Sequence, residues 1–367
     1  MLLLSILPFA AASMVSARNN YAEIKELSSS NKHSWFGGKF KNLVVFGDSY
    51  TDESRLDYFT AHNNTPPPVG LLLPESLDAS DGGRVWPRYV SQYSGAKLYN
   101  YAIASGICTT SIMPQARATL KDLSAAILET EMPAWLAELH LTSAVSPHQK
   151  FYTGSADDTL YAMWIGVNDI GKKNIFIDSQ TTGTSLTTFT DCVFTAFDRI
   201  YKNGGRKFVL MNVPPLELHP IYATPEKKGV PPGTPDWPNK PSNLTEVSFK
   251  MYEYTSAVNE ISKFQVPFQQ HVAKRYPGAK WAIYDVNSLF KDIHRNPQKY
   301  LNGTTPLDVL DFIHHCEAGA ANCTDLPGDR DSFMFYDSLH PSEQVHRVVA
   351  QNFMDVINGG SKFATYW

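Results

Sequence analysis

Five short apolar runs alternate with helical patterns along the chain, and this alternation restricts the possible folds more than any other feature. The spacing between successive runs leaves room for a helix, as in an α/β protein. Strands that are joined through helices pair in parallel, and the helices then cover both faces of the sheet. The sequence therefore predicts an α/β fold around a central parallel sheet of five strands, at Leu43–Phe46, Lys97–Tyr101, Leu160–Ile165, Phe208–Asn212 and Trp281–Asp285.

Helical periodicity follows or separates these runs. It predicts helices from Ala118 to Leu139, from Leu186 to Tyr201, from Glu246 to Tyr276 with a kink at Pro267, and from Pro341 onward. Two long irregular stretches, at 53–83 and 214–245, follow the first and the fourth predicted strands. Loops of this length in a compact domain are usually functional or mobile. Because both leave the carboxyl end of a strand, we expect them to form a rim around one site.

The composition fits a globular protein that does not bind nucleic acid. The chain has 367 residues, of which 43% are hydrophobic and 19% charged, and its net charge is −4. Nucleic-acid binders usually carry a basic excess or a basic patch. We therefore expect no nucleic-acid partner.

Residues 1–17 have the character of a secretory signal peptide. They carry no charge and end in the small residues of Val15-Ser16-Ala17, which predicts cleavage before Arg18, although the basic start of such peptides is missing. A membrane anchor is the alternative, but the apolar run is short for a span of about 20 residues. We expect a secreted, extracellular protein without stable membrane insertion, in which a lead-in segment at 18–40 precedes one domain at 41–367.

Sequons and cysteines agree with secretion. Four Asn-x-Ser/Thr sequons are candidates for glycosylation, at Asn63, Asn243, Asn302 and Asn322. The four cysteines allow three pairings, and we favour Cys316 with Cys323 and Cys108 with Cys192 because the first two lie close in a loop-like stretch. A zinc site of His314, His315, Cys316 and Cys323 is the alternative, but its spacing matches no standard ligand pattern.

The first predicted strand runs directly into Gly47-Asp48-Ser49. Its residues are apolar without polar alternation, which is typical of a buried strand that ends in a tight turn. Ligands of open α/β sheets bind outside the carboxyl ends of the strands, so a serine in this turn is a candidate nucleophile. All three residue types also favour ordinary turns.

Three other segments supply what a serine nucleophile needs. His340 in Asp337-Ser338-Leu339-His340-Pro341 is a candidate base, which Asp337 would orient from three residues upstream. Asn168 follows the third strand and can donate an amide hydrogen bond to an oxyanion. Gly106 follows the second strand, and a glycine there lets a backbone N–H approach a ligand. Glycine and asparagine are also common in ordinary turns, and the alternative for Asp337 and His340 is a loop end next to a helix start.

Taken together, Ser, Gly, Asn and Asp-x-x-His in this order resemble the SGNH (GDSL) hydrolase superfamily, from about Leu43 to Ala350. The segments FGDSYTD, GGRVWPRYV, NYA, GVNDIG and DSLHPS are similar to those of fungal secreted acetylesterases of the carbohydrate-esterase type. The resemblance implies a flavodoxin-like three-layer α/β/α sandwich without metal or organic cofactor. It implies Ser49 as nucleophile, His340 as general base and Asp337 as its orienter, with an oxyanion hole of the Ser49 and Gly106 N–H groups and the Asn168 side chain. One departure is Ala-Ser-Gly-Ile-Cys around Gly106, where many relatives carry paired glycines.

The predicted reaction is the hydrolysis of short-chain acetyl esters through an acyl-enzyme, by a monomer acting on a small-molecule or oligosaccharide ester. Aromatic residues near the long loops, Trp86 and Trp237, are candidates for stacking on sugar. The alternative is a lipase or phospholipase in which Val69–Leu73 lines an acyl site. A glycoprotein that binds carbohydrate without catalysis would require a vestigial site, whereas all five site residues are chemically intact. The chain lacks Gly-x-Ser-x-Gly, which argues against an α/β-hydrolase elbow.

Overall fold

A computed structural model describes residues 35–36, 40–114, 124–142, 150–234, 236–304, 306–316 and 322–367. The predicted signal peptide and most of the predicted lead-in segment lie outside these residues. Of the lead-in, Trp35, Phe36 and Phe40 are buried, and the Trp35 indole donates a hydrogen bond to the Trp281 carbonyl at 2.8 Å. Among the described residues, no helix combines the length and the apolar character that crossing a bilayer requires.

A six-stranded sheet forms the centre of the fold, in the order β10-β5-β4-β3-β1-β2. The strands that the sequence predicted are β1 (Asn42–Gly47), β2 (Lys97–Asn100), β3 (Thr159–Trp164), β4 (Lys207–Met211) and β5 (Lys280–Tyr284). All their pairings are parallel. Since β1 and β3 are adjacent and share their register from Asn42 with Thr159 to Gly47 with Trp164, their carboxyl ends meet at one edge.

The predicted α/β fold is therefore confirmed, but the predicted count of five strands is wrong. The sixth strand, β10 (Ala364–Tyr366), pairs antiparallel with β5 at the sheet edge. It has three residues, which is too short to give the sequence an apolar run, and the long-range pairing with Ile283 and its neighbours makes it a strand.

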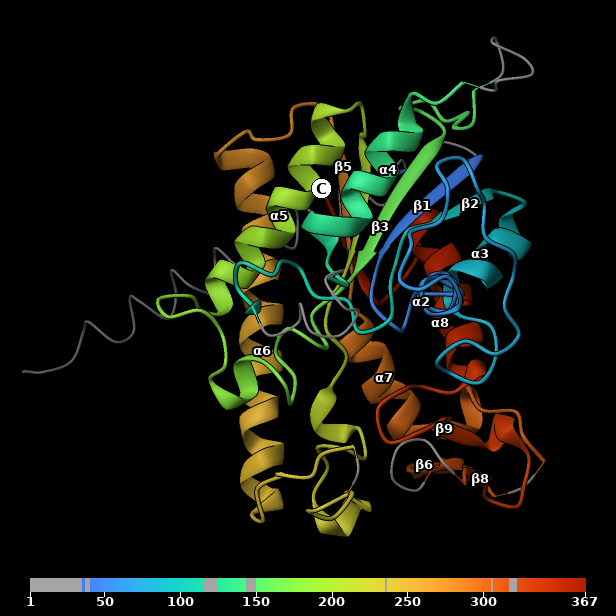
Figure 1. Cartoon of the computed structure of the whole chain (residues 1–367), viewed down its shortest axis with the longest axis vertical. Coiled ribbons are helices and arrows are strands. Elements are labelled where there is room, and N and C mark those ends of the chain that lie inside the picture. The colour runs from blue at the N-terminus through green and yellow to red at the C-terminus, as the bar shows by residue number, and fades with distance from the viewer. Residues whose placement is uncertain are drawn as a thin grey trace, which may run out of the picture.

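Helices cover both faces of this sheet. Figure 1 shows α5 (Leu186–Lys202) and α6 (Leu244–Pro267) on one side and α3 (Trp86–Ser94) and α8 (Glu343–Ile357) on the other. The side chains of the strands are buried between these layers in one continuous hydrophobic core. The other α-helices of the described residues are α2 (Arg55–Ala61), α4 (Met132–Leu139) and α7 (Val286–Arg295).

Helix boundaries differ from those predicted wherever proline or a backbone pairing intervenes. Helix α4 begins at Met132 after a π-helical turn at Ile127–Glu131, because the backbone of Ala125 and Ile127 hydrogen-bonds to Ile107 instead; part of the predicted helix, 115–123, lies outside the described residues. Helix α6 ends at Pro267 and passes into a π-helical turn at Phe268–Val272, where a kink was predicted.

The last helix begins at Glu343 with Ser342 as its N-cap, and not at Pro341. The Pro341 backbone instead bridges to Phe335. This difference keeps the chain from Asp337 to Pro341 outside the helix, in the turn that carries His340.

The long stretches are more structured than predicted. Residues 53–83 contain α2, and 214–245 contain short 3₁₀ turns at Leu216–Leu218 and Pro225–Lys227. Beyond the main sheet, β6 (Asp308–Phe312) pairs with β9 (Phe333–Phe335), and β7 (His314–His315) pairs with β8 (Thr324–Asp325). These two small ribbons lie together beside α7 in Figure 1 and precede the His340 turn.

Candidate active site

Ser49 lies two residues beyond the end of β1, in a tight turn. The N–H groups of Thr51 and Asp52 both donate to the Asp48 carbonyl, at 2.9 and 2.8 Å. Gly47 permits the close approach to the neighbouring strand, since a Cβ there would lie 2.3 Å from the Trp164 carbonyl oxygen. The Ser49 residue is 7% exposed, so the turn holds its hydroxyl in a restricted position at the sheet edge.

His340 joins Ser49 to Asp337. Its Nε2 lies 2.8 Å from the Ser49 hydroxyl, and its Nδ1 lies 2.8 Å from Asp337 Oδ2. The other oxygen of Asp337 accepts the backbone N–H groups of Leu339 and His340, both at 2.7 Å. The Tyr50 hydroxyl donates to the Leu339 carbonyl at 2.5 Å and so connects this turn to the serine turn. The structure thus brings together three residues that span 291 positions of sequence.

The interaction between His340 and Asp337 favours an ionised carboxylate and makes the imidazole more basic. Burial opposes the charge of His340, but the Asp337 carboxylate and its hydrogen bond outweigh burial and raise the pKa of the imidazole above its ordinary value. Burial likewise opposes the charge of Asp337, but the His340 charge and the hydrogen bonds that the carboxylate accepts lower its pKa. Asp337 is therefore a carboxylate near neutral pH, and it orients and supports the imidazole.

Asn168 and Gly106 lie beside this serine, but only Asn168 keeps an N–H group available for the predicted oxyanion hole. The Asn168 amide donates one hydrogen bond to the Gly106 carbonyl at 3.0 Å, which leaves its second N–H for another acceptor. The Gly106 N–H is already used, because it donates to the Ile103 carbonyl at 2.9 Å. Gly106 therefore holds Asn168 in place through its carbonyl.

Ser105, which the sequence analysis did not single out, has the properties expected of the missing donor. It lines the same cleft as Ser49 and Asn168, and its φ of +65° is unusual for a residue other than glycine. Within the described part of the chain, neither the Ser105 N–H nor the Ser49 N–H has a hydrogen-bond acceptor. The sequence held one signal for this residue, because Ala-Ser-Gly-Ile-Cys stands here where many relatives carry paired glycines.

Comparison with protein families matches residues 43–353 to the family described as GDSL-like Lipase/Acylhydrolase. The chain belongs to this family. Within it, an acetylesterase of Hypocrea jecorina is 39% identical over 330 residues, which cover 89% of this chain and 92% of the relative. An acetylesterase of Thermothelomyces thermophilus is 23% identical over 322 residues, which cover 87% and 89%. These relatives identify the chain as a carboxylic ester hydrolase.

Among solved structures, the α/β hydrolase LAE5, from the metagenome of Lake Arreo in Spain, matches with a TM-score of 0.41 and 13% identity, over 89% of this chain and 99% of that chain. An acetylxylan esterase of Geobacillus stearothermophilus matches with a TM-score of 0.36 and 12% identity, over 87% and 95%.

In this GDSL hydrolase, four buried carboxyl groups accept hydrogen bonds that stabilise the backbone around the site residues. They accept backbone N–H groups from the end of β1, the turns after β1 and β2, and the start of α2: Glu131 from Gly47, Asp48 from Tyr50, Asp169 from Cys108, and Asp52 from Ser54, Arg55, Leu56 and Ala104. Burial raises the pKa of all four, and it raises those of Asp48 and Asp169 to about 7. No spacing pattern in the sequence marks such a set.

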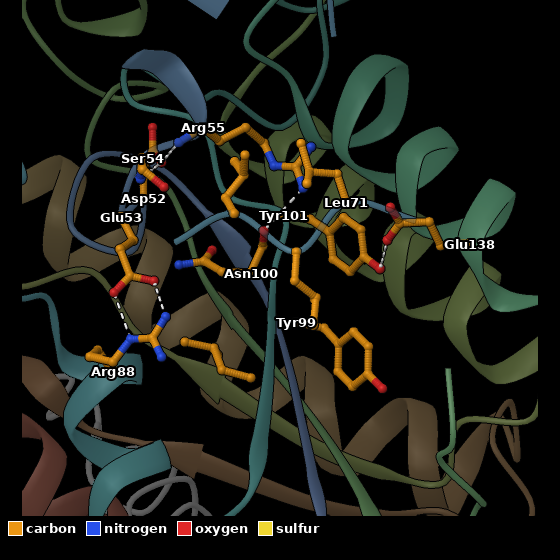
Figure 2. A pocket seen from close by; sticks show the side chains of 13 residues that line it. Asp52, Glu53, Ser54, Arg55, Leu71, Arg88, Tyr99, Asn100, Tyr101 and Glu138 are labelled. Carbon is orange, nitrogen blue, oxygen red and sulfur yellow. Dashed lines mark hydrogen bonds and ion pairs between the residues drawn. The ribbon is translucent and has the colours of Figure 1, made fainter. Parts of the chain in front are cut away.

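A small cavity, separate from the cleft of Ser49, is lined mainly by residues of the first long loop and β2 (Figure 2). Its volume is about 20 Å³, which is room for a single water molecule. Glu53 and Arg88 form a two-pronged ion pair there at 2.7 Å, and Tyr101 donates to Glu138 at 2.6 Å. Leu71–Leu73 line this cavity and not the cleft of Ser49.

The cleft that contains Ser49 and His340 has a volume of about 760 Å³. Both long loops contribute to its walls, the first through Leu56 and the second through Trp237. Of the two tryptophans predicted to stack on sugar, Trp237 lines the cleft, whereas Trp86 is buried in the core and donates to the Thr51 hydroxyl at 3.1 Å. For Trp86 the prediction is wrong.

The cysteines form two disulfides, Cys108–Cys192 and Cys316–Cys323. His314, Cys316 and Cys323 cluster closely enough to hold a metal, but both sulfurs are already joined to each other. The thiolates that zinc binds are therefore absent from this arrangement. The four sequon asparagines are all exposed.

Proposed function

We propose that the chain is a secreted serine acetylesterase that removes O-acetyl groups from sugars or oligosaccharides. One observation carries the proposal: the hydrogen-bonded series Ser49–His340–Asp337, with both links at 2.8 Å, opens into a cleft of about 760 Å³. This arrangement has the geometry of an activated serine nucleophile with an oriented base.

The proposed reaction is acyl transfer to water. Ser49 Oγ attacks the acetyl carbonyl while His340 Nε2 takes its proton, and His340 then gives this proton to the leaving alcohol. Water attacks the acetyl-enzyme with His340 again as base, which releases acetate and restores the serine. Asp337 stays ionised throughout and stabilises the imidazolium that forms in each step.

The oxyanion that develops in both steps needs preorganised donors. We assign this role to the N–H of Ser49, the N–H of Ser105 and the free amide N–H of Asn168, with Ser105 in place of Gly106. The support is that the two backbone groups have no acceptor within the described residues and that all three residues line the cleft. A donor of this kind contributes roughly 3–4 kcal/mol to transition-state stabilisation.

Acetyl esters of sugars are the substrate class that the observations favour. The two relatives named above are acetylesterases. Trp237 places an aromatic ring in the cleft wall, where it can pack against a sugar ring. The apolar loop Val69–Leu73, on which a lipase would rely, does not line this cleft.

Secretion is supported by sequence and structure together. The uncharged leader at 1–17, two disulfides and four exposed sequon asparagines are all typical of the secretory pathway. Mass spectrometry of the protein from the culture medium tests this, since it gives the mature N-terminus and the occupied sequons in one measurement.

Replacement of Ser49 tests the mechanism. Ser49→Ala removes the nucleophile, so kcat on p-nitrophenyl acetate should fall by about 10⁴-fold or more. The matched control is Ser54→Ala, whose hydroxyl bonds to the Pro74 carbonyl and does not line the cleft. A folded Ser49→Ala enzyme with near wild-type turnover would refute the assignment.

Two further measurements separate the alternatives. The acetylesterase should prefer p-nitrophenyl acetate to the octanoate, and the reverse preference would favour a lipase. A fluorophosphonate should label the wild type at Ser49, whereas a protein that only binds carbohydrate should not react.

A further inference from the structure

The charge that lines the active-site cleft is positive, although the chain as a whole carries −4. Apart from His340, the charged residues that line the cleft are Lys172 and Lys173. Among its described lining residues there is no aspartate or glutamate. A neutral acetylated sugar gives no physical reason for this one-sided distribution.

Lys172 lines the same cleft as Ser49 and His340, and its backbone is held in place. It follows Asn168 by four residues in the turn after β3, and its backbone N–H donates to the Tyr222 hydroxyl at 3.0 Å. Tyr222 and Asn168 line the same cleft. The backbone of Lys172 therefore keeps a defined position relative to the amide that we assign to the oxyanion.

The Lys172 ammonium is half-buried and lacks a close counter-ion. It forms no ion pair with any acidic residue of the described chain, whereas Lys228 pairs with Asp308 and Lys291 with Glu217. Burial lowers the pKa of Lys172, and the charges of Asp236 and Asp337 oppose this, so the ammonium lies within electrostatic reach of the catalytic carboxylate. An ammonium in this state gains free energy when an anion binds beside it.

A third lysine adds to the positive potential at this wall. Lys240 donates to the Val230 carbonyl at 2.5 Å and lies 5.6 Å from the ring centre of Trp237, which lines the cleft. Burial and the nearby charge of Lys172 lower the pKa of Lys240 to about 8. Because the Lys240 ammonium is held by a carbonyl, Lys172 and the exposed Lys173 are the lysines of this wall that are available to a ligand.

We infer that this lysine wall selects esters whose alcohol half carries a carboxylate, namely acetylated oligosaccharides that contain a uronic acid. The inference rests on the proposed acetylesterase function. An acetyl group is too small to carry the charge, so the carboxylate must belong to the sugar that leaves. The aromatic ring of Trp237 in the same wall favours a sugar over the phosphate of a lipid headgroup as the source of the negative charge.

A matched substrate pair tests the selection. Acetylated methyl glucuronide and acetylated methyl glucoside differ only in a carboxylate against a hydroxymethyl group. The ratio of their kcat/KM values should favour the glucuronide about tenfold at low salt, mainly through KM, and should approach one near 1 M salt, where the Debye length is about 3 Å. A ratio of one or below at low salt overturns the inference.

Lysine variants locate the effect. Lys172→Met keeps the length of the stem but removes the charge, and it should reduce the glucuronide preference to near one, while Lys172→Arg should retain most of it. The matched control is Lys202→Met in the last turn of α5, which should leave the ratio at the wild-type value. An unchanged preference in Lys172→Met overturns the inference.

Two parallel assays separate this inference from the function on which it rests. If the wild type fails to hydrolyse p-nitrophenyl acetate and both sugars, the proposed function fails. If it hydrolyses them without preference, only the selection fails. If the enzyme hydrolyses an anionic phospholipid in vesicles faster than either sugar, the lysines recognise a lipid phosphate. This outcome overturns the inference.

Discussion

At the carboxyl ends of the strands, polar groups on the side that faces the cleft differ in their hydrogen bonding from polar groups on the buried side. On the cleft side, the N–H groups of Ser49 and Ser105 and the ammonium of Lys172 have no close partner within the described residues. On the buried side, the carboxyl groups of Asp52 and Asp169 are held by backbone N–H groups of the same turns. Hydrogen bonds on the buried side fix the turns, and this leaves the groups on the cleft side free for a substrate.

Asp337 acts on the cleft through its hydrogen bond to His340, and its replacement should have the largest effect. In Asp337→Asn an amide meets His340 Nδ1, which favours the wrong imidazole tautomer, so kcat should fall by about 10⁴-fold. The fold should be retained, because one amide oxygen can still accept the N–H groups of Leu339 and His340. Turnover of p-nitrophenyl acetate and the unfolding midpoint in urea measure the two effects.

The same variant should shift the pH profile. The base must be neutral, so kcat/KM of the wild type should rise with pH through the pKa of His340, which lies above its ordinary value of 6.5. Removal of the Asp337 charge removes the main cause of that increase, and the acidic limb should move to lower pH. A limb that does not move would show that another group titrates.

Gly106 lies between the backbone at the end of β1 and the turn after β2, and its replacement should affect both activity and stability. A Cβ there would lie 2.6 Å from the Gly47 carbonyl oxygen and 2.7 Å from that of Ile103, both backbone atoms that cannot rotate away. Gly106→Ala should therefore push apart the turns after β1 and β2. We expect a loss of about 1–3 kcal/mol in unfolding free energy and up to about 10²-fold in kcat.

The matched control is Gly360→Ala, where a Cβ would meet nothing within 4 Å. It should change the unfolding free energy by no more than about 0.5 kcal/mol. If Gly106→Ala behaves like this control in urea and in the esterase assay, the two turns are not packed as closely as the structure indicates.

The groups that the sequence could reveal are those in short motifs at strand ends. Ser49, Asn168 and His340 each follow or precede an element that periodicity predicts, so a parallel sheet places them at one edge. The sequence could not show that the Gly106 N–H donates to Ile103, because this hydrogen bond depends on the shape of the turn and not on residue type.

Other features depend on contacts between distant segments. Strand β10 exists through its pairing with β5, and Glu131 reaches Gly47 across 84 positions. Lys172 is one lysine among many in the sequence. What distinguishes it is a half-buried position without a counter-ion, which becomes visible only once the cleft walls are assembled.

On the buried side, the expected effect is on the pH dependence of stability. Burial, with a contribution from the Asp48 charge, raises the pKa of Asp169 from 3.8 to about 7, although the N–H of Cys108 opposes this. The folded state therefore keeps a proton between about pH 4 and 7 that the unfolded state has released. Stability contributed by this group is present at low pH and is lost as the pH rises towards 7.

Asp169→Asn should remove this part of the pH dependence without breaking the turn, because the amide oxygen can still accept the Cys108 N–H that Asp169 accepts at 2.8 Å. Urea unfolding at pH 5, 6 and 7 should show a slope against pH that is shallower than in the wild type by up to about 1.4 kcal/mol per pH unit, which corresponds to one proton. Asp48 and Asp81, whose pKa values are also raised to about 7, should contribute to the remaining slope. Parallel curves for the two proteins would mean that Asp169 is ionised in the fold, and the buried side would then carry charge as the cleft side does.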